Sequence, residues 1–184
     1  MKIILYRGPS GAGKSTHANK VIDYCRNNNL SYQYCSADDF FVNETGDYKY
    51  SHHKICHAHT YCFDSFMSAC GSKEDIIIVD NTNITLWEVM PYLQVAHYYD
   101  APVHLLEFDA PWRVRMHNQQ HNIPEEKIKA QAMIDLPGHI LKHYVDTVTK
   151  CFDYNIAEAK AWAVGYNDTQ HLGKYVWLGK VGLT

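Results

Sequence analysis

The sequence predicts an α/β fold in which helices cover both faces of a parallel sheet. Two observations indicate this fold class. Short apolar runs alternate with longer amphipathic patterns, and the run Asp-Ile-Ile-Ile-Val at residues 75–79 has a continuous β-branched core. Such a run is typical of a strand that is buried on both faces of a parallel sheet. Strands that alternate with helices form βαβ units, which build sheets of this kind.

The individual elements follow in chain order. We expect strands at residues 2–6, 31–35, 75–79 and 103–108, and helices near residues 16–28, 52–70 and 85–99. Pro91 lies within the last of these helices and is expected to bend or interrupt it, because proline lacks the N–H that helix bonding needs. Residues 111–134 are again helical in pattern, with a second segment that begins at Pro124.

The chain length suits one domain with a substantial core, and we assign residues 1–150 to that domain. A further amphipathic helix is expected at residues 137–151. Residues 151–184 are expected to form a C-terminal appendage of unknown role, with a candidate helix at 156–164 and a candidate strand at 174–178.

Composition narrows the class of protein. The chain is 46% hydrophobic and 13% aromatic, which is typical of a globular protein. No apolar run approaches the roughly 18 residues of a membrane span, so we expect no membrane partner. The six cysteines show no disulfide framework, and we interpret them as reduced thiols of a cytoplasmic protein. A net charge of −3 lacks the basic excess of proteins that grip long nucleic acids, so nucleic-acid contact is expected to be local.

The first strand leads into the segment Gly-Pro-Ser-Gly-Ala-Gly-Lys-Ser-Thr, which has the G-x-x-x-x-G-K-[ST] spacing of a phosphate-binding P-loop. Its glycines permit turns that aim several N–H groups at one anion. Lys14 is expected to reach the β- and γ-phosphates and Ser15 to bind Mg²⁺. A merely glycine-rich turn is the alternative, but strand, loop and helix follow in the order that triphosphate binding requires. The residues expected to bind the triphosphate are Gly8, Ser10, Gly11, Ala12, Gly13, Lys14, Ser15 and Thr16.

Two adjacent carboxylates, Asp38 and Asp39, follow the second predicted strand. The carboxyl ends of parallel strands face the ligand crevice, so these side chains are expected near the phosphates. A carboxylate in that place can accept the proton of an attacking hydroxyl. A helix cap is the alternative role. We favour Asp38 as the base and leave Asp39 as a second candidate.

A third carboxylate, Asp80, follows the apolar strand at 75–79 and begins the segment Asp-Asn-Thr-Asn. An acidic residue in this place can hold Mg²⁺, directly or through water. The alternative is an Asx turn, for which Asn81 and Asn83 are suitable. We favour the magnesium role for Asp80, together with Ser15.

Phosphoryl transfer also benefits from a cation over the transferring group. Of the four arginines, Arg113 and Arg115 follow the fourth predicted strand. Because they are two positions apart on a helix, only one is expected to face the site.

The histidine-rich segment at residues 52–59 places His52, Cys56 and His59 on one helix face. A zinc site is one interpretation, but no second ligand cluster accompanies it. We favour a polar helix face that lines an acceptor groove.

Together these motifs resemble the P-loop kinases related to phage polynucleotide 5′-kinase and to the kinase domain of NEDD4-binding protein two. The likeness spans residues 1–135. It includes the P-loop with Arg7 before it, the segment Ser-Ala-Asp-Asp-Phe-Phe, the later Gly-Asp-Tyr-Lys-Tyr, and Val-Asp-Asn-Thr-Asn. It continues through the fourth strand and Ala-Pro-Trp to a segment that begins at Gln119. The resemblance implies a helical lid at about residues 111–134.

The resemblance further implies transfer of phosphate from ATP, with Mg²⁺, to the 5′-hydroxyl of a nucleic-acid end. It would make Asp38 the general base, Lys14 and Ser15 the ATP and Mg²⁺ ligands, and a lid arginine the stabiliser of the transferring phosphate. Two positions depart from the family pattern. Phe41 replaces an acceptor-binding arginine, and the usual lid arginine is replaced near His117, so that Arg115 is the nearest substitute.

The sequence therefore predicts an ATP-dependent kinase whose acceptor is a polynucleotide 5′-hydroxyl. A nucleoside, another small alcohol or a hydroxylated base in DNA is the alternative acceptor, and a non-catalytic nucleotide-binding module is the alternative class. Aromatic rings, including that of Tyr48, could stack on a terminal base or could simply be core. The residues expected to contact the acceptor are Asp39, Phe40, Phe41, Tyr50, Thr82 and Asn83.

Overall fold

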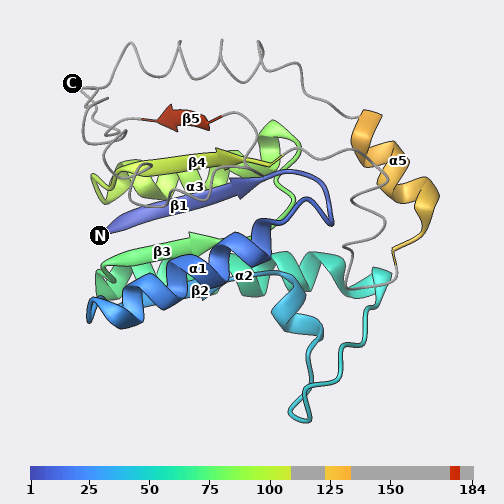
Figure 1. Ribbon diagram of the computed structural model, residues 1–184, viewed down its shortest axis with the longest axis horizontal. Helices are drawn as coiled ribbons and strands as arrows, with labels where there is room; N and C mark the ends of the chain where they lie inside the picture. The colour runs from blue at the N-terminus through green and yellow to red at the C-terminus, as the bar shows by residue number, and fades with distance from the viewer. Residues whose placement is uncertain (109–122, 134–174, 179–184) are drawn as a thin grey trace.

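The computed structural model describes residues 1–108, 123–133 and 175–178. They contain a five-stranded sheet with the order β2-β3-β1-β4-β5. The strands are β1 (Lys2–Arg7), β2 (Tyr32–Cys35), β3 (Ile76–Val79), β4 (Val103–Glu107) and β5 (Tyr175–Leu178). The first four run parallel, and β5 pairs antiparallel with β4. Figure 1 shows the carboxyl ends of the parallel strands together at one edge of the sheet.

The four parallel strands confirm the sequence prediction to within one residue at each end. All four residues of β3 are buried, as its β-branched run requires, and β1 is buried from Ile3 to Arg7. Burial on both faces explains why these central strands are apolar throughout rather than alternating. The prediction of a parallel α/β sheet is therefore confirmed.

Helices cover both faces of the sheet, as predicted. α1 (Lys14–Asn27) packs against one face, where Ile4 and Tyr6 of β1 join its core. α2 (Ile55–Ser72) and α3 (Leu86–Tyr98) pack against the other face, where the core includes Ile3 and Leu5. Successive residues of β1 thus alternate between two cores, as the two-residue period of a strand requires.

The helix boundaries differ from the prediction in informative places. α1 begins at Lys14, inside the P-loop motif, because Gly13 serves as its N-cap with a φ of 95°. A short 3-10 helix, η2 (His52–Lys54), precedes α2. α3 continues through Pro91 to Tyr98, so the proline does not end the helix. A second short 3-10 helix, η1 (Asp38–Phe41), follows β2.

Two later elements also match expectations. α5 (Glu125–Met133) begins directly after Pro124, where the second helical segment was expected. The predicted strand at 174–178 is confirmed as β5, which extends the main sheet beyond β4. The helices expected at 137–151 and 156–164, and the first part of the lid, lie outside the described residues. Among the described helices, none is long and apolar enough to cross a membrane.

Candidate active site

Four connecting segments meet at the carboxyl edge of the parallel strands. The P-loop joins β1 to α1, Asp38 and Asp39 follow β2, Asp80 follows β3, and Phe108 follows β4. In Figure 1 this edge also faces α5. Ligands of open parallel sheets bind at this edge, where the connections diverge to opposite faces. The structure therefore brings the predicted donor and base residues to one end of the molecule.

Position 8 of the P-loop requires glycine for two reasons, its backbone conformation and its close contact with Phe108. Its φ is 146°, and an added Cβ would lie 2.3 Å from the carbonyl oxygen of Phe108. Its N–H donates to the carbonyl of Thr82 at 2.8 Å. Gly8 is thus held between the segments that follow β4 and β3. Any side chain at this position would displace the loop from both.

The rest of the loop has the backbone of an anion cradle. Gly11 has a φ of 75° and Gly13 a φ of 95°, both in the region that favours glycine. α1 begins without a capping side chain or an acidic residue in its first turn. Its first N–H groups are therefore suited to a negatively charged ligand, which the helix dipole also favours. Within the loop, the N–H of Ala12 donates to the carbonyl of Pro9 at 3.3 Å.

Lys14 is buried at the centre of this loop. Its Nζ donates to the carbonyl oxygens of Gly8 and Pro9 at 2.9 and 3.0 Å. The ammonium group therefore lies inside the turn that the glycines create. A phosphate in the cradle would meet this positive charge directly.

Asp80 lies beside the P-loop, with 5% of its surface exposed. Its Oδ2 accepts a hydrogen bond from the hydroxyl of Tyr34 at 2.8 Å. Burial raises the pKa of Asp80, while the charge of Lys14 and hydrogen bonds from Ser15 and Tyr34 oppose that rise. Ser15 and Asp80, the two predicted magnesium ligands, are thus brought together. The sequence analysis missed Tyr34, whose place one residue before the end of β2 was the available signal.

Asp38 and Asp39 occupy η1, where they point to different surroundings. Oδ1 of Asp38 accepts a hydrogen bond from the hydroxyl of Tyr48 at 3.1 Å. Burial raises the pKa of Asp39, and the charges of Asp38 and Asp80 add to the rise. The N-cap of η1 is Ala37, which makes no side-chain cap bond, so neither aspartate fills the capping role.

The carboxylates do not form a ready-made metal site. Within the described part of the chain, no group of three or more His, Cys, Asp or Glu side chains could hold a metal ion. The described residues thus give no support to the zinc interpretation of His52, Cys56 and His59. Mg²⁺ is usually bound through one or two carboxylates plus substrate phosphates and water.

A hairpin positions Tyr48 against Asp38. Val42 and Tyr48 form an antiparallel bridge. The side chain of Asn43 closes the turn by accepting bonds from the N–H groups of Thr45 and Asp47 at 3.1 and 2.7 Å. Gly46 takes a φ of 84° at its tip. The spacing Asn-x-x-Gly at residues 43–46 is a turn signal that could have predicted this hairpin.

The asparagines after Asp80 serve the scaffold, which corrects one acceptor prediction. Asn83 is 2% exposed, and its Nδ2 donates to the carbonyl of Tyr6 at 2.7 Å. Oδ1 of Asn81 accepts from the N–H of Ala37 at 2.9 Å. These amides tie the segment after β3 to β1 and to the segment after β2. Asn83 is too buried to meet an acceptor, whereas the side chain of Thr82 is half-buried.

The predicted stacking residues divide into two groups. Phe41 is 5% exposed and belongs to the core shared with α2, so the expectation that its ring meets an acceptor is wrong in this structure. Tyr50 is 45% exposed and packs on Phe41 with a centroid distance of 5.1 Å. Phe40 and Tyr48 are half-buried. Phe41 thus supports the exposed ring from beneath.

An ion pair that sequence reasoning did not identify underlies the loop. Arg7 at the end of β1 pairs with Glu107 of β4, its register partner. Nη2 of Arg7 also donates to the carbonyl of Ile84 at 3.0 Å. The pair therefore joins the ends of two strands to the segment that enters α3. The candidate lid arginines, Arg113 and Arg115, lie outside the described residues.

Comparison with known proteins agrees with this fold. Residues 3–134 match a family of AAA domains designated AAA_33, and the chain belongs to this family. The human protein NEDD4-binding protein 2 is 29% identical over 130 residues. That alignment covers 68% of this chain but only 7% of the relative, so the chain spans a small part of that protein's length.

Solved structures share the fold at lower identity. A chain of the Pnkp1/Rnl/Hen1 RNA repair complex is similar with a TM-score of 0.58 and 20% identity, over 73% of this chain and 43% of the other. A second structure of the Pnkp1/Rnl/Hen1 complex has a TM-score of 0.52 and 21% identity, over 67% and 40%. This chain thus shares the fold of these two structures and spans less than half of each of the two matched chains.

Proposed function

We propose that this domain transfers the γ-phosphoryl group of ATP to a hydroxyl, and that the acceptor is the 5′-hydroxyl of a polynucleotide. The single observation that carries the proposal is the pairing of two sets of groups at one sheet edge. Lys14 and Ser15 of the P-loop lie close to Asp80. Asp38 lies on the same edge, where it accepts a hydrogen bond from Tyr48. A protein that only binds nucleotide needs no carboxylate held at the acceptor side.

The donor residues fit a magnesium-bound triphosphate. The glycine cradle and the uncapped start of α1 suit the phosphates, and the buried ammonium of Lys14 supplies a positive charge. Ser15 and Asp80 would hold Mg²⁺, the hydroxyl directly and the carboxylate directly or through water. When bound, Mg²⁺ neutralises charge on the phosphate oxygens.

The transfer step assigns one role to each acceptor-side group. The acceptor hydroxyl gives its proton to Asp38 and forms the new oxygen–phosphorus bond, while the bond from the γ-phosphorus to the bridging oxygen breaks and ADP leaves. The Tyr48 hydroxyl keeps the carboxylate in place, as a positioning residue. We assign stabilisation of the transferring group to Arg115 or Arg113, in keeping with the family resemblance.

The relatives support this acceptor without deciding it. Because a structural neighbour belongs to an RNA repair complex, an RNA end comes first among the acceptors to be tested. A nucleoside is the second candidate, and one observation favours it: Phe41, buried in the core, stands where the resemblance expects an acceptor-binding arginine. The free thiols of the described cysteines fit the proposed cytoplasmic setting.

The test uses γ-labelled ATP with 5′-hydroxyl RNA and DNA oligonucleotides, nucleosides and modified duplex DNA. We expect label on oligonucleotide 5′ ends, and loss of that label in Lys14→Ala and in Asp38→Asn. Asp23→Asn is the matched control, because it removes an exposed carboxylate of α1 that pairs only with the exposed Arg26. Label on nucleosides or on internal bases would overturn the 5′-end assignment. ATP binding without transfer to any acceptor would overturn the kinase assignment.

A further inference from the structure

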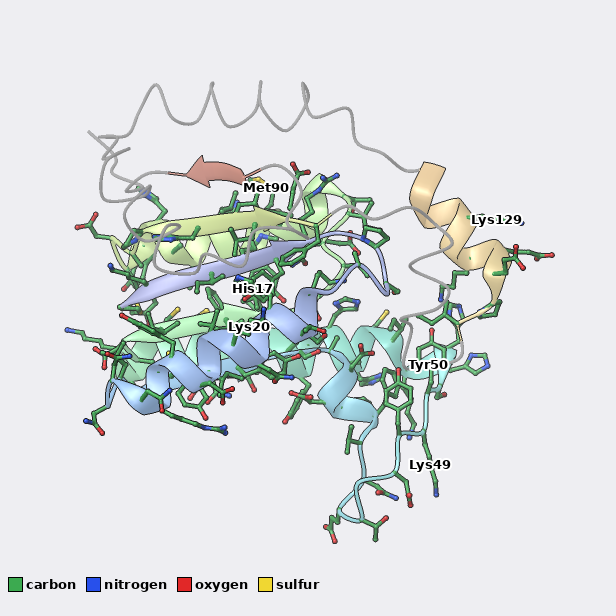
Figure 2. The ribbon with its side chains drawn as sticks, viewed as in Figure 1. His17, Lys20, Lys49, Tyr50, Met90 and Lys129 are labelled. Atoms are coloured by element: carbon green, nitrogen blue, oxygen red, sulfur yellow. The ribbon has the colours of Figure 1, made fainter. Side chains whose placement is uncertain are left out.

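A stretch with basic and aromatic side chains begins beside the proposed base. Between Asp47 and Asp64 the sequence contains Lys49, Lys54 and four histidines but no acidic residue. The chain as a whole has a net charge of −3, so this stretch departs from the average. Its cations are exposed along the segment from Lys49 through η2. Figure 2 shows Lys49 and Tyr50 at the end of the molecule that also carries α5.

Aromatic rings connect this stretch to Asp38. Tyr48 donates to Asp38, and its ring lies 6.0 Å from that of Phe41. Phe41 in turn lies 5.1 Å from Tyr50, whose hydroxyl is 3.4 Å from Nδ1 of His52. The exposed ring of Tyr50 thus packs on a buried ring and is connected to Asp38 through Phe41 and Tyr48. Such a ring can stack on a nucleobase at little cost in conformational entropy.

A cation from α5 reaches the same ring. Nζ of Lys127 lies 5.6 Å from the centroid of Tyr50. The neighbouring Lys129 pairs with Glu125 at 2.6 Å, so its charge is engaged within α5. The contact of Lys127 with Tyr50 joins α5, in the second part of the expected lid, to the acceptor side of the site.

We propose that these residues form an acceptor track for single-stranded nucleic acid. The acceptor track is Lys49, Tyr50, His52, His53, Lys54 and Lys127. Tyr50 stacks on a nucleobase near the 5′ end, and the lysines of the track contact the phosphates that follow it. The inference rests on the proposed function for the position of the 5′-hydroxyl at Asp38.

The chemistry favours a single strand over a duplex. Bases that are paired and stacked in a duplex have no free face for Tyr50, whereas a single strand presents one. The track is also short, which agrees with a chain that lacks a general basic excess. It supplies the phosphate contacts that Phe41, standing in place of an arginine, cannot make.

The first test varies acceptor length from a nucleoside 3′-phosphate to an octanucleotide, each with a 5′-hydroxyl. We expect kcat/KM to rise about ten-fold over the first few nucleotides, since stacking on an aromatic ring contributes roughly this factor or more per base. Equal values at all lengths would overturn the track while leaving the kinase assignment intact. A blunt duplex end that reacts as well as the single strand would also overturn it.

The second test removes the ring. Tyr50→Ala is expected to lower kcat/KM about ten-fold for the octanucleotide, whereas Tyr50→Phe keeps the parent values. The matched control is Tyr98→Ala, which removes a ring that is 81% exposed at the end of α3. A parent value of kcat/KM in Tyr50→Ala, or an equal loss in Tyr98→Ala, would contradict the proposal. A matching loss of ATP affinity in Tyr50→Ala would mean a general structural role and would also contradict it.

The third test is independent of catalysis. Fluorescence anisotropy with a labelled octanucleotide measures binding even where no phosphate is transferred. Lys49→Gln with Lys54→Gln is expected to weaken binding and to lessen its dependence on salt, because each phosphate contact adds about 0.7 to the slope for single strands. Lys20→Gln on α1 is the control. If the oligonucleotide bound with the same affinity and salt slope in the double variant, the track would be wrong, whatever the acceptor of the kinase proves to be.

Discussion

The proposed donor and acceptor sides of the site are built in different ways. On the donor side, Lys14 and Asp80 are buried, and Gly8 is held by backbone atoms of Phe108 and Thr82. On the acceptor side, Asp38 and Tyr50 are exposed, and their partner Tyr48 is carried by a surface hairpin. The donor side is thus integrated with the core of the sheet. The acceptor side is an addition that could change without rebuilding the fold.

This difference has a physical reason. A triphosphate presents the same charge and shape to every enzyme of this kind, so a rigid cradle that is part of the fold serves it well. Acceptors differ, and loops on a rigid scaffold are where such specificity is usually placed. The following predictions test this contrast, in decreasing order of expected effect.

The largest effect is expected from Asp38→Asn. Loss of the proposed base should reduce kcat by about 10²- to 10⁴-fold while leaving ATP affinity near the parent value, because the donor contacts are intact. Single-turnover kinetics and ATP titration measure the two quantities separately. Asp39→Asn is the comparison, with a much smaller expected loss; a larger loss there than at Asp38 would reverse the assignment of the base.

On the donor side, Gly8→Ala should destabilise the fold as well as the site. The added Cβ would meet the Phe108 carbonyl at 2.3 Å, at a backbone φ of 146°. We expect the free energy of unfolding to fall by roughly 3 kcal/mol, measured by urea denaturation. Gly46→Ala is the matched control: its φ of 84° brings strain, but no atom lies within 4 Å of an added Cβ. Equal losses of stability in the two variants would show that the close approach to Phe108 contributes nothing to the free energy of unfolding.

Tyr48→Phe tests the acceptor side more gently. It removes the hydroxyl that donates to Asp38 and keeps the ring that packs on Phe41. We expect kcat to fall about ten-fold, in line with the loss of one hydrogen bond to a charged group. An unchanged kcat with normal stability would mean that Tyr48 only packs.

The smallest effect concerns the pH dependence of folding stability that arises from His17, on the proposed donor side. His17 of α1 lies against Tyr6, whose hydroxyl is 2.7 Å from Nδ1, and burial with the nearby charge of Lys20 lowers the His17 pKa to about 4. The unfolded chain binds this proton below about pH 6.5, whereas the folded chain does so only near pH 4. This contribution to stability is therefore present above pH 6.5 and is lost as the pH falls toward 4.

His17→Gln should flatten part of that decline, because glutamine can bond to Tyr6 without titrating. Thermal unfolding of parent and variant from pH 7 to 4.5 measures the difference, so that other titrating groups cancel. His57→Gln, at an exposed position of α2, is the control and should follow the parent. If His17→Gln kept the full decline, other groups would account for it.

Much of the donor side was predictable because its signals are local. The P-loop spacing identified the residues around Lys14, and an apolar strand followed by a carboxylate identified Asp80. Both depend on short segments whose position at the sheet edge follows from strand order. Tyr34 was missed because its hydrogen bond to Asp80 joins β2 to the end of β3, residues far apart in the chain.

The acceptor side was less predictable because its signals are tertiary. Residue type did not distinguish Phe41 from Tyr50, yet one is core and the other is exposed. Asn83 has the residue type of a ligand, but its amide is used by the carbonyl of Tyr6. The cation above Tyr50 comes from Lys127, which a long segment separates from it.

Local sequence patterns were enough to establish that this chain forms a parallel α/β sheet with a P-loop, since hydrophobic periodicity and glycine spacing act over a few residues. Which side chains meet at the sheet edge depends instead on how the elements pack. The tertiary structure placed Tyr34 and Ser15 on Asp80 and Tyr48 on Asp38, and it buried Phe41 beneath Tyr50. The reason is that burial and side-chain pairing depend on which elements pack together, and no local pattern records that packing.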